Sequence, residues 1–181
     1  MNHTFNIIGR DPGTNTGIAV YTIDTNFNIL NIDTYTILLN NYVNDDNTVL
    51  GKDSERYLVL GNLIEELLEK YNPIAIALES AFINKKFMGS GMKVMGYISV
   101  ILYVIKKFNP NILLCKLAPK SVKKKAGDAT ANKDKMKELV NETILQYIDI
   151  EKESKHSIDA ISIGYSLINL IKSFPYLLKL R

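Results

Sequence analysis

Four side chains of this sequence combine carboxylate and imidazole groups in a way that could support metal chemistry: Asp11, Glu79, His156 and Asp159. Asp11 stands before a Pro-Gly pair and closes an apolar run, residues 5–10. Glu79 closes a second apolar run, residues 74–78. Open α/β sheets build their sites where the strands end, so both carboxylates are expected at that edge. An acid there is costly to bury unless it pairs or binds a cation.

His156 and Asp159 lie three residues apart near the start of a predicted helix, residues 155–172, which Ser154 can cap. This spacing places both side chains on one helical face. Three carboxylates and an imidazole from distant segments suit a divalent cation, and the oxygen donors favour Mg²⁺ or Mn²⁺.

Each of these residues also has an ordinary structural interpretation. An Asp before Pro-Gly is common in turns, and a Glu at a strand end often forms a salt bridge. His156 and Asp159 could simply be polar residues of a first helical turn. The metal hypothesis therefore depends on the joint arrangement of the four side chains.

Positive charge is concentrated in one segment, residues 116–137. It holds eight lysines against two aspartates, although the net charge of the whole chain is only +3. Such a segment indicates a localised anion-binding surface. The alternative is a solvated lysine-rich surface without a ligand.

Hydrophobic periodicity predicts the element order β-β-β-α-β-α-β-α-α. The predicted strands are residues 5–10, 17–23, 29–38, 74–78 and 112–117. The predicted helices follow Asp53 or Ser54 and run to residue 71, and then span residues 92–108, 133–147 and 155–172. Asp53 or Ser54 can cap the first of them, and Asn132 can cap the third. Residues 39–52 are predicted to be a loop. This order predicts an α/β fold: a mixed five-stranded sheet, made of a three-strand antiparallel meander plus parallel strands, with helices on both faces.

Length and composition are those of one globular domain spanning residues 1–181. No apolar run approaches the ~20 residues of a membrane span, and the N-terminus lacks the features of a signal peptide. The single cysteine, Cys115, lies in an apolar run and is expected to be a buried thiol in a reducing compartment. These features predict a cytoplasmic protein.

Four motifs resemble those of the RuvC-type Holliday junction resolvases, and they occur in the family's order along nearly the whole chain. They are IIGRDPGTNTGIAV, IALESAF, APKSVKKKAGDATANKDKMKELV and HSIDAISIGYSL. The resemblance implies an RNase H-like fold and a nuclease that hydrolyses phosphodiester bonds. It also implies that Asp11, Glu79, His156 and Asp159 bind the metal, with two Mg²⁺ ions expected per active site and Mn²⁺ able to substitute.

The resemblance further implies which residues meet DNA. Phe82 matches an aromatic position that engages bases at the crossover, and Lys133 matches a catalytic basic position near the scissile phosphate or DNA backbone. The full set of expected DNA-binding residues is Phe82, Lys93, Lys120, Lys123, Lys124, Lys125 and Lys133.

The implied function is a structure-selective endodeoxyribonuclease that resolves four-way (Holliday) junctions by paired, metal-dependent cuts in DNA recombination and repair. Two symmetric nicks call for a homodimer, and the predicted helix 92–108 is a candidate interface or an ordinary core helix.

Two alternatives remain: a broader branched-DNA or flap nuclease of the same fold, and a non-catalytic junction-binding protein. An actin-like ATPase, suggested by residues 9–17, needs two domains where this chain has room for one. The sequence gives no indication of whether a branch-migration motor assists.

Overall fold

The computed structural model describes residues 3–43, 51–81, 88–118, 121–122, 138, 144 and 146–178. The strands are β1 (Phe5–Asp11), β2 (Asn15–Ile23), β3 (Ile29–Leu38), β4 (Ala75–Glu79) and β5 (Leu113–Leu117). The helices are α1 (Lys52–Tyr71), α2 (Met88–Phe108) and α5 (Lys155–Ser173), with short 3-10 turns η1 (Leu39–Tyr42), η3 (Ile150–Lys152) and η4 (Pro175–Leu178).

The five strands form one mixed sheet in the order β3-β2-β1-β4-β5. Strands β1, β2 and β3 form an antiparallel meander, whereas β4 is parallel to β1 and β5 is parallel to β4. Short turns join the meander, and helix α2 makes the longer crossover between the parallel strands, as parallel pairing requires. The predicted mixed sheet is confirmed.

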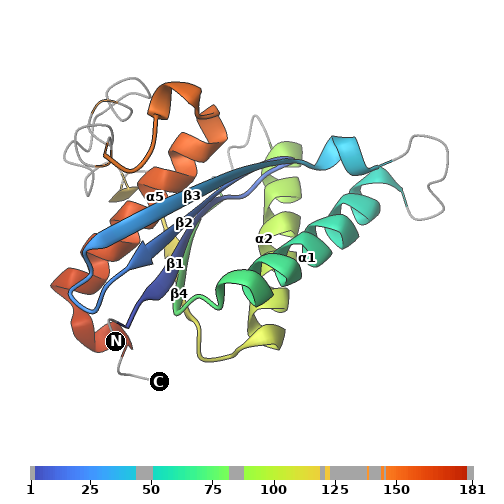
Figure 1. The fold of residues 1–181 in the computed structure, drawn as a ribbon. Coiled ribbons are helices and arrows are strands. Elements are labelled where there is room, and N and C mark those ends of the chain that lie inside the picture. Colours follow the sequence, from blue (N-terminus) through green and yellow to red (C-terminus); the bar gives the residue numbers. More distant parts are fainter. Residues whose placement is uncertain are drawn as a thin grey trace.

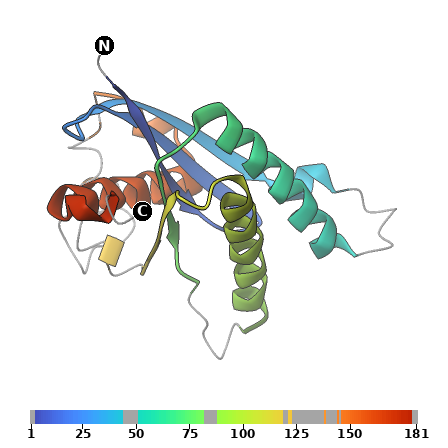
Figure 2. The same ribbon diagram turned by 90° about the horizontal axis from the view of Figure 1, so that it is seen from below.

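Helices cover both faces of the sheet. Helix α5 lies along one face, and α1 and α2 pack together on the other (Figures 1 and 2). Successive side chains of a strand point to opposite faces, so β1 contributes Ile7 to the core beneath α5 and Ile8 to the core beneath α1 and α2. No helix in the described part of the chain combines the length and apolar character needed to cross a membrane.

The α5 face is packed backbone against backbone. A Cβ atom added to Gly9 would overlap backbone atoms of Ala160 and Gly164, and one added to Gly164 would overlap the ring of Tyr21. The Tyr21 hydroxyl donates a hydrogen bond to the carbonyl oxygen of Ile161, at 2.6 Å. Helix α5 can therefore lie close to β1 and β2 because Gly9 and Gly164 have no side chain at the point where the helix crosses the strands.

Some details of the sequence predictions were wrong. Helix α1 begins at Lys52 after Gly51, whose φ of +81° favours glycine, and no side chain caps it. Asp53 does not cap the helix because its carboxylate pairs with Arg56 and Lys93. Cys115 is half-buried rather than buried.

The remaining helices differ from the predictions mainly in where they begin. Helix α2 begins at Met88, earlier than predicted, and the predicted loop 39–52 starts with η1 and ends in α1. The predicted cap of the last helix is confirmed, because the Ser154 side chain accepts a hydrogen bond from the Ser157 amide. The predicted helix 133–147, with its Asn132 cap, falls almost wholly outside the described residues.

Candidate metal centre

Asp11 and Glu79 end two neighbouring parallel strands. The register pairs Arg10 of β1 with Leu78 of β4, so Asp11 and Glu79 lie one step further along at the same level. Asp11 shares a face with Gly9, and Glu79 shares a face with Ala77; both of those residues lie on the α5 side. Both carboxylate side chains therefore start from the same edge of the sheet, as the sequence predicted, and the structure adds that they start from the same face.

Helix α5 brings His156 to this edge. The His156 Nδ1 atom lies 2.9 Å from the Asp11 Oδ2 atom, although the two residues are 145 positions apart in the sequence. The Asp11 side chain is 16% exposed and that of His156 is 38% exposed, so the pair remains open to solvent. Asp159 lies one helical turn beyond His156 and is half-buried.

The four predicted ligands are not drawn together around a single point. Among the described residues, no three His, Cys, Asp or Glu side chains are close enough to one another to hold a metal ion. Asp11 and His156 are in direct contact, through the Nδ1 and Oδ2 atoms. By their chemistry the donors fit a hard divalent cation, since three are carboxylates and the fourth is an imidazole. Binding would require Asp11 and His156 to exchange their mutual contact for the ion.

The start of α5 is fixed by a cluster of hydroxyl groups. The Thr36 hydroxyl of β3 lies 2.6 Å from the Ser154 hydroxyl and 2.8 Å from the Ser157 hydroxyl. Gly17 of β2 faces the backbone of His156 so closely that a Cβ atom there would overlap the His156 carbonyl group. The helix turn that carries His156 is therefore positioned by β2 and β3.

A buried cation lies next to Asp11 in the sequence but on the opposite face of the sheet. Arg10 is 2% exposed, and its Nε and Nη2 atoms have no hydrogen-bond partner among the described residues. Burial lowers the pKa of the Arg10 guanidinium to about 9, against the opposing effect of the Asp11 carboxylate. The structure thus keeps a positive charge in the core beneath α1 and α2, with two of its nitrogen atoms lacking a hydrogen-bond partner in the described part of the chain.

Of the predicted DNA-binding residues, only Lys93 lies within the described part of the chain. The Lys93 Nζ atom forms an ion pair of 3.0 Å with the Asp53 Oδ2 atom, and 54% of the lysine side chain is exposed. This contact is the largest cause of the lowered pKa of the Asp53 carboxyl. The other six lie outside the described residues: Phe82, Lys120, Lys123, Lys124, Lys125 and Lys133.

The sequence analysis missed the residues that hold the ligands in place. Gly9, Gly17 and Thr36 bear no functional group that would attract notice in one sequence. The glycines within apolar strands were the one available signal, because glycine in a strand interior often marks a close backbone approach. The partners of Thr36 are more than 100 positions away, and only the folded chain brings them together.

A profile of the crossover junction endodeoxyribonuclease RuvC family matches residues 7–166 of this chain. The crossover junction endodeoxyribonuclease RuvC of Orientia tsutsugamushi (strain Boryong) is 30% identical over 166 residues, which cover 88% of this chain and 92% of the relative. The chain belongs to the RuvC family. The match includes all four candidate metal ligands, which lie between positions 11 and 159.

Solved structures agree with the predicted RNase H-like fold. The structure of Thermus thermophilus RuvC in complex with Holliday junction substrate superposes with a TM-score of 0.64 at 18% identity, covering 90% of this chain and 91% of that one. The yeast mitochondrial Holliday junction resolvase gives a TM-score of 0.68 at 17% identity, covering 99% of this chain and 85% of that one. At these identities the likeness to the RuvC-type structures establishes the fold.

Proposed function

We propose that this member of the RuvC family is a structure-selective endodeoxyribonuclease that resolves four-way DNA junctions by paired, metal-dependent hydrolysis. The observation that carries the proposal is the meeting of Asp11 and His156, 2.9 Å apart, at the sheet edge where Glu79 also ends its strand. These residues come from the beginning, middle and end of a chain that matches the RuvC family from residue 7 to residue 166.

In this proposal Asp11, Glu79 and Asp159 supply carboxylate oxygens, and His156 supplies a neutral imidazole nitrogen. Two Mg²⁺ ions, or Mn²⁺ in their place, would when bound assist in-line attack of water on the scissile phosphate. The chain's own residues orient the ligands: Gly17 and the hydroxyls of Ser154 and Thr36 hold the first turn of α5, while β1 and β4 hold the two strand-end carboxylates.

DNA binding is assigned to the lysine-rich segment 116–137, to Lys93 and to Phe82. Lys93 supports this role because its exposed ammonium is held by one carboxylate, which a phosphate oxygen could replace. Lysine contacts with phosphates make such binding sensitive to salt. Phe82 would stack on bases at the junction, and Lys133 would lie near the scissile phosphate.

We further propose that two copies associate through the α1/α2 groove, a hollow of about 620 Å³ lined mainly by the exposed sides of those two helices. Leu58 of α1 is 61% exposed and Tyr103 of α2 is 69% exposed, and both line it. A second copy would cover these apolar side chains and place two active sites on one junction, which has matching two-fold symmetry.

The test is a synthetic immobile four-way junction incubated with the protein, with and without Mg²⁺, followed by mapping of the nicks. Symmetric nicks with 5′-phosphate and 3′-hydroxyl ends are expected only when Mg²⁺ is present. Asp11→Asn and Glu79→Gln should reduce cutting at least about a hundredfold while junction binding survives. Asp24→Asn is the matched control, because Asp24 lies in the β2–β3 turn at the far end of the sheet and should leave cutting intact.

Other outcomes would redirect the proposal. Equal cutting of flaps and four-way junctions would favour a broader branched-DNA nuclease. Tight junction binding without cutting under any divalent ion would indicate a non-catalytic junction-binding protein. Unchanged cutting by Asp11→Asn would remove the metal assignment itself.

A further inference from the structure

The turn that follows Asp11 is tied down at several points. The Thr16 hydroxyl donates to the Gly13 carbonyl oxygen at 2.7 Å and accepts from the Gly13 amide at 3.3 Å. The Leu39 amide donates to the Thr14 carbonyl oxygen at 3.0 Å. These bonds come from β2 and from η1, so both neighbouring segments of the meander restrain the turn.

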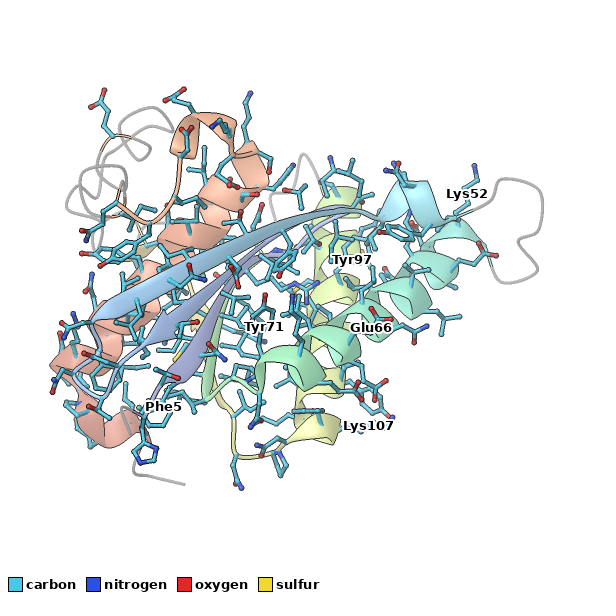
Figure 3. All side chains as sticks on the ribbon, in the orientation of Figure 1. Phe5, Lys52, Glu66, Tyr71, Tyr97 and Lys107 are labelled. Atoms are coloured by element: carbon cyan, nitrogen blue, oxygen red, sulfur yellow. The ribbon has the colours of Figure 1, made fainter. Side chains whose placement is uncertain are left out.

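A tyrosine of α2 reaches the same turn from the other face of the sheet. The Tyr97 hydroxyl lies 3.1 Å from the Thr14 hydroxyl, and the two residues are 83 positions apart. The Tyr97 side chain is 1% exposed and is fully embedded in the core beneath α1 and α2. Figure 3 shows Tyr97 on α2.

Tyr97 is itself held by α1. Its ring packs edge to face against the ring of Tyr57, with centroids 5.1 Å apart and an interplanar angle of 72°. The neighbouring Gly96 allows this approach, because a Cβ atom there would overlap the Tyr57 hydroxyl. The hydroxyl of Tyr97 is therefore presented to Thr14 from a fixed position.

We propose that Tyr97 is a positioning residue for the catalytic turn: its hydroxyl, through Thr14, fixes the turn that sets the placement of Asp11. The inference rests on the proposed function, in which Asp11 is a metal ligand. Asp11 is the last residue of β1 and is continuous with the turn, so a shift of the turn passes directly to its carboxylate. A displacement of about 1 Å in a catalytic group can lower a rate up to a hundredfold.

The variants are Tyr97→Phe, Thr14→Val and the two combined. Each single variant removes one side of the contact and keeps the side-chain shape. Tyr71→Phe is the matched control: it also removes a tyrosine hydroxyl on the α1/α2 face, which donates to Asp33 at 2.9 Å. Tyr71 ends α1 at the opposite end of the sheet, where Figure 3 shows it apart from Tyr97.

We expect kcat on a four-way junction to fall about five- to tenfold in Tyr97→Phe, with little change in KM. The kcat of Thr14→Val should fall by a similar factor. The kcat of the double variant should be no lower than that of either single variant, because all three lack the same hydrogen bond. Tyr71→Phe should retain the wild-type kcat even if its thermal midpoint drops. Equal kcat values for Tyr97→Phe and wild type, or fully multiplicative losses in the double variant, would overturn the inference.

A second measurement does not depend on cutting. Hydrogen exchange of the Leu39 amide, which is bonded to the Thr14 carbonyl oxygen, should become faster in Tyr97→Phe and stay unchanged in Tyr71→Phe. Unchanged exchange in Tyr97→Phe would overturn the inference whether or not the protein cuts DNA. If the wild type cut no junction while Tyr97→Phe loosened the turn and weakened Mn²⁺ binding, the proposed function would fail and the positioning role would stand. If the wild type cut no junction and Tyr97→Phe loosened the turn without changing Mn²⁺ binding, the positioning role of Tyr97 would also be contradicted.

Discussion

The two faces of the sheet are built differently. Beneath α5 the backbones of helix and strands touch, and glycines at positions 9, 17 and 164 leave no room for a methyl group. Beneath α1 and α2 apolar side chains pack together, and the core also holds the guanidinium of Arg10, whose Nε and Nη2 atoms have no hydrogen-bond partner among the residues that the structure describes. The outer surface of these helices carries an apolar groove. The first face brings Asp11 and His156 into contact at the sheet edge where Glu79 ends β4, whereas the second carries the candidate dimer surface.

This difference indicates where positional accuracy is needed. Catalytic groups must be held within about 0.5 Å of a working geometry, and direct backbone packing achieves that better than flexible side chains. A dimer surface and an ordinary core tolerate adjustment, because side chains can repack. The α5 face should therefore respond sharply to added volume at Gly9 and Gly17, and the α1/α2 face should respond weakly or even gain stability where a new Cβ atom has room, as at Gly61.

The largest expected effect is that of Gly9→Ala. The new methyl group would overlap Ala160 and Gly164, so α5 must move away from β1. We expect a loss of about 3 kcal/mol or more in the free energy of unfolding, measured by urea denaturation, together with a loss of junction cutting. A loss below about 1 kcal/mol would mean that the face adjusts easily, and the contrast between the two faces would disappear.

An intermediate effect of opposite sign is expected on the other face. Arg10→Met replaces a buried cation, two of whose nitrogen atoms have no hydrogen-bond partner in the described residues, by an apolar side chain of similar length. The substitution should raise the free energy of unfolding at pH 7 by about 1–4 kcal/mol. Urea denaturation of both proteins measures the difference. Destabilisation by the substitution would show that the guanidinium is well paired in solution.

The stabilisation by Arg10→Met should also depend on pH. Burial lowers the pKa of Arg10 to about 9 in the folded protein, well below the ordinary value that the group has in the unfolded chain, so between these two values the unfolded chain binds more protons. The wild type therefore gains stability as pH rises above about 9, while the cost of burying the charge is fully present below that pH. The difference in the free energy of unfolding between Arg10→Met and the wild type should be constant from pH 7 to 8 and should decrease from pH 9 upward. A difference that increased there would contradict the assigned burial of the charge.

The smallest effect is expected from Gly61→Ala in α1. Here a new Cβ atom would meet Val100 and Val104 of α2 at 3.7 and 3.8 Å, which are ordinary contacts. Alanine is the better helix former by about 1 kcal/mol, so the free energy of unfolding should rise by up to that amount. Thermal unfolding of Gly61→Ala beside Gly9→Ala compares the same substitution on the two faces. Equal destabilisation by both would remove the distinction between them.

The strands and the helix start that carry the candidate ligands were predictable, because they depend on short local patterns in the sequence. The apolar runs ending at Asp11 and Glu79 predicted two strands and the common edge at which the two carboxylates leave the sheet. The spacing of His156 and Asp159, with Ser154 before them, predicted the start of α5 and its cap. Each of these patterns is weak evidence alone, and their agreement with the order of the family's motifs made the prediction specific.

The remaining features depend on contacts between residues far apart in the chain. Asp53 is a plausible helix cap in the sequence, but the approach of α2 turns it into an ion-pair partner of Lys93. The sequence does not show on which side of the sheet the charged Arg10 lies, and the pleat of β1 directs it into the core. The contact of Tyr97 with Thr14 has no local signature, because it depends on how a crossover helix packs on a turn formed 83 residues earlier.

The most direct test of the central claim is a crystal structure of the protein soaked with Mn²⁺, with the ions located by their anomalous scattering. We predict two Mn²⁺ peaks on the α5 side of the sheet edge, bound by Asp11, Glu79, His156 and Asp159, with the contact between Asp11 and His156 replaced by metal ligation. Mn²⁺ bound elsewhere, or an unchanged contact between Asp11 and His156 at saturating Mn²⁺, would contradict the account.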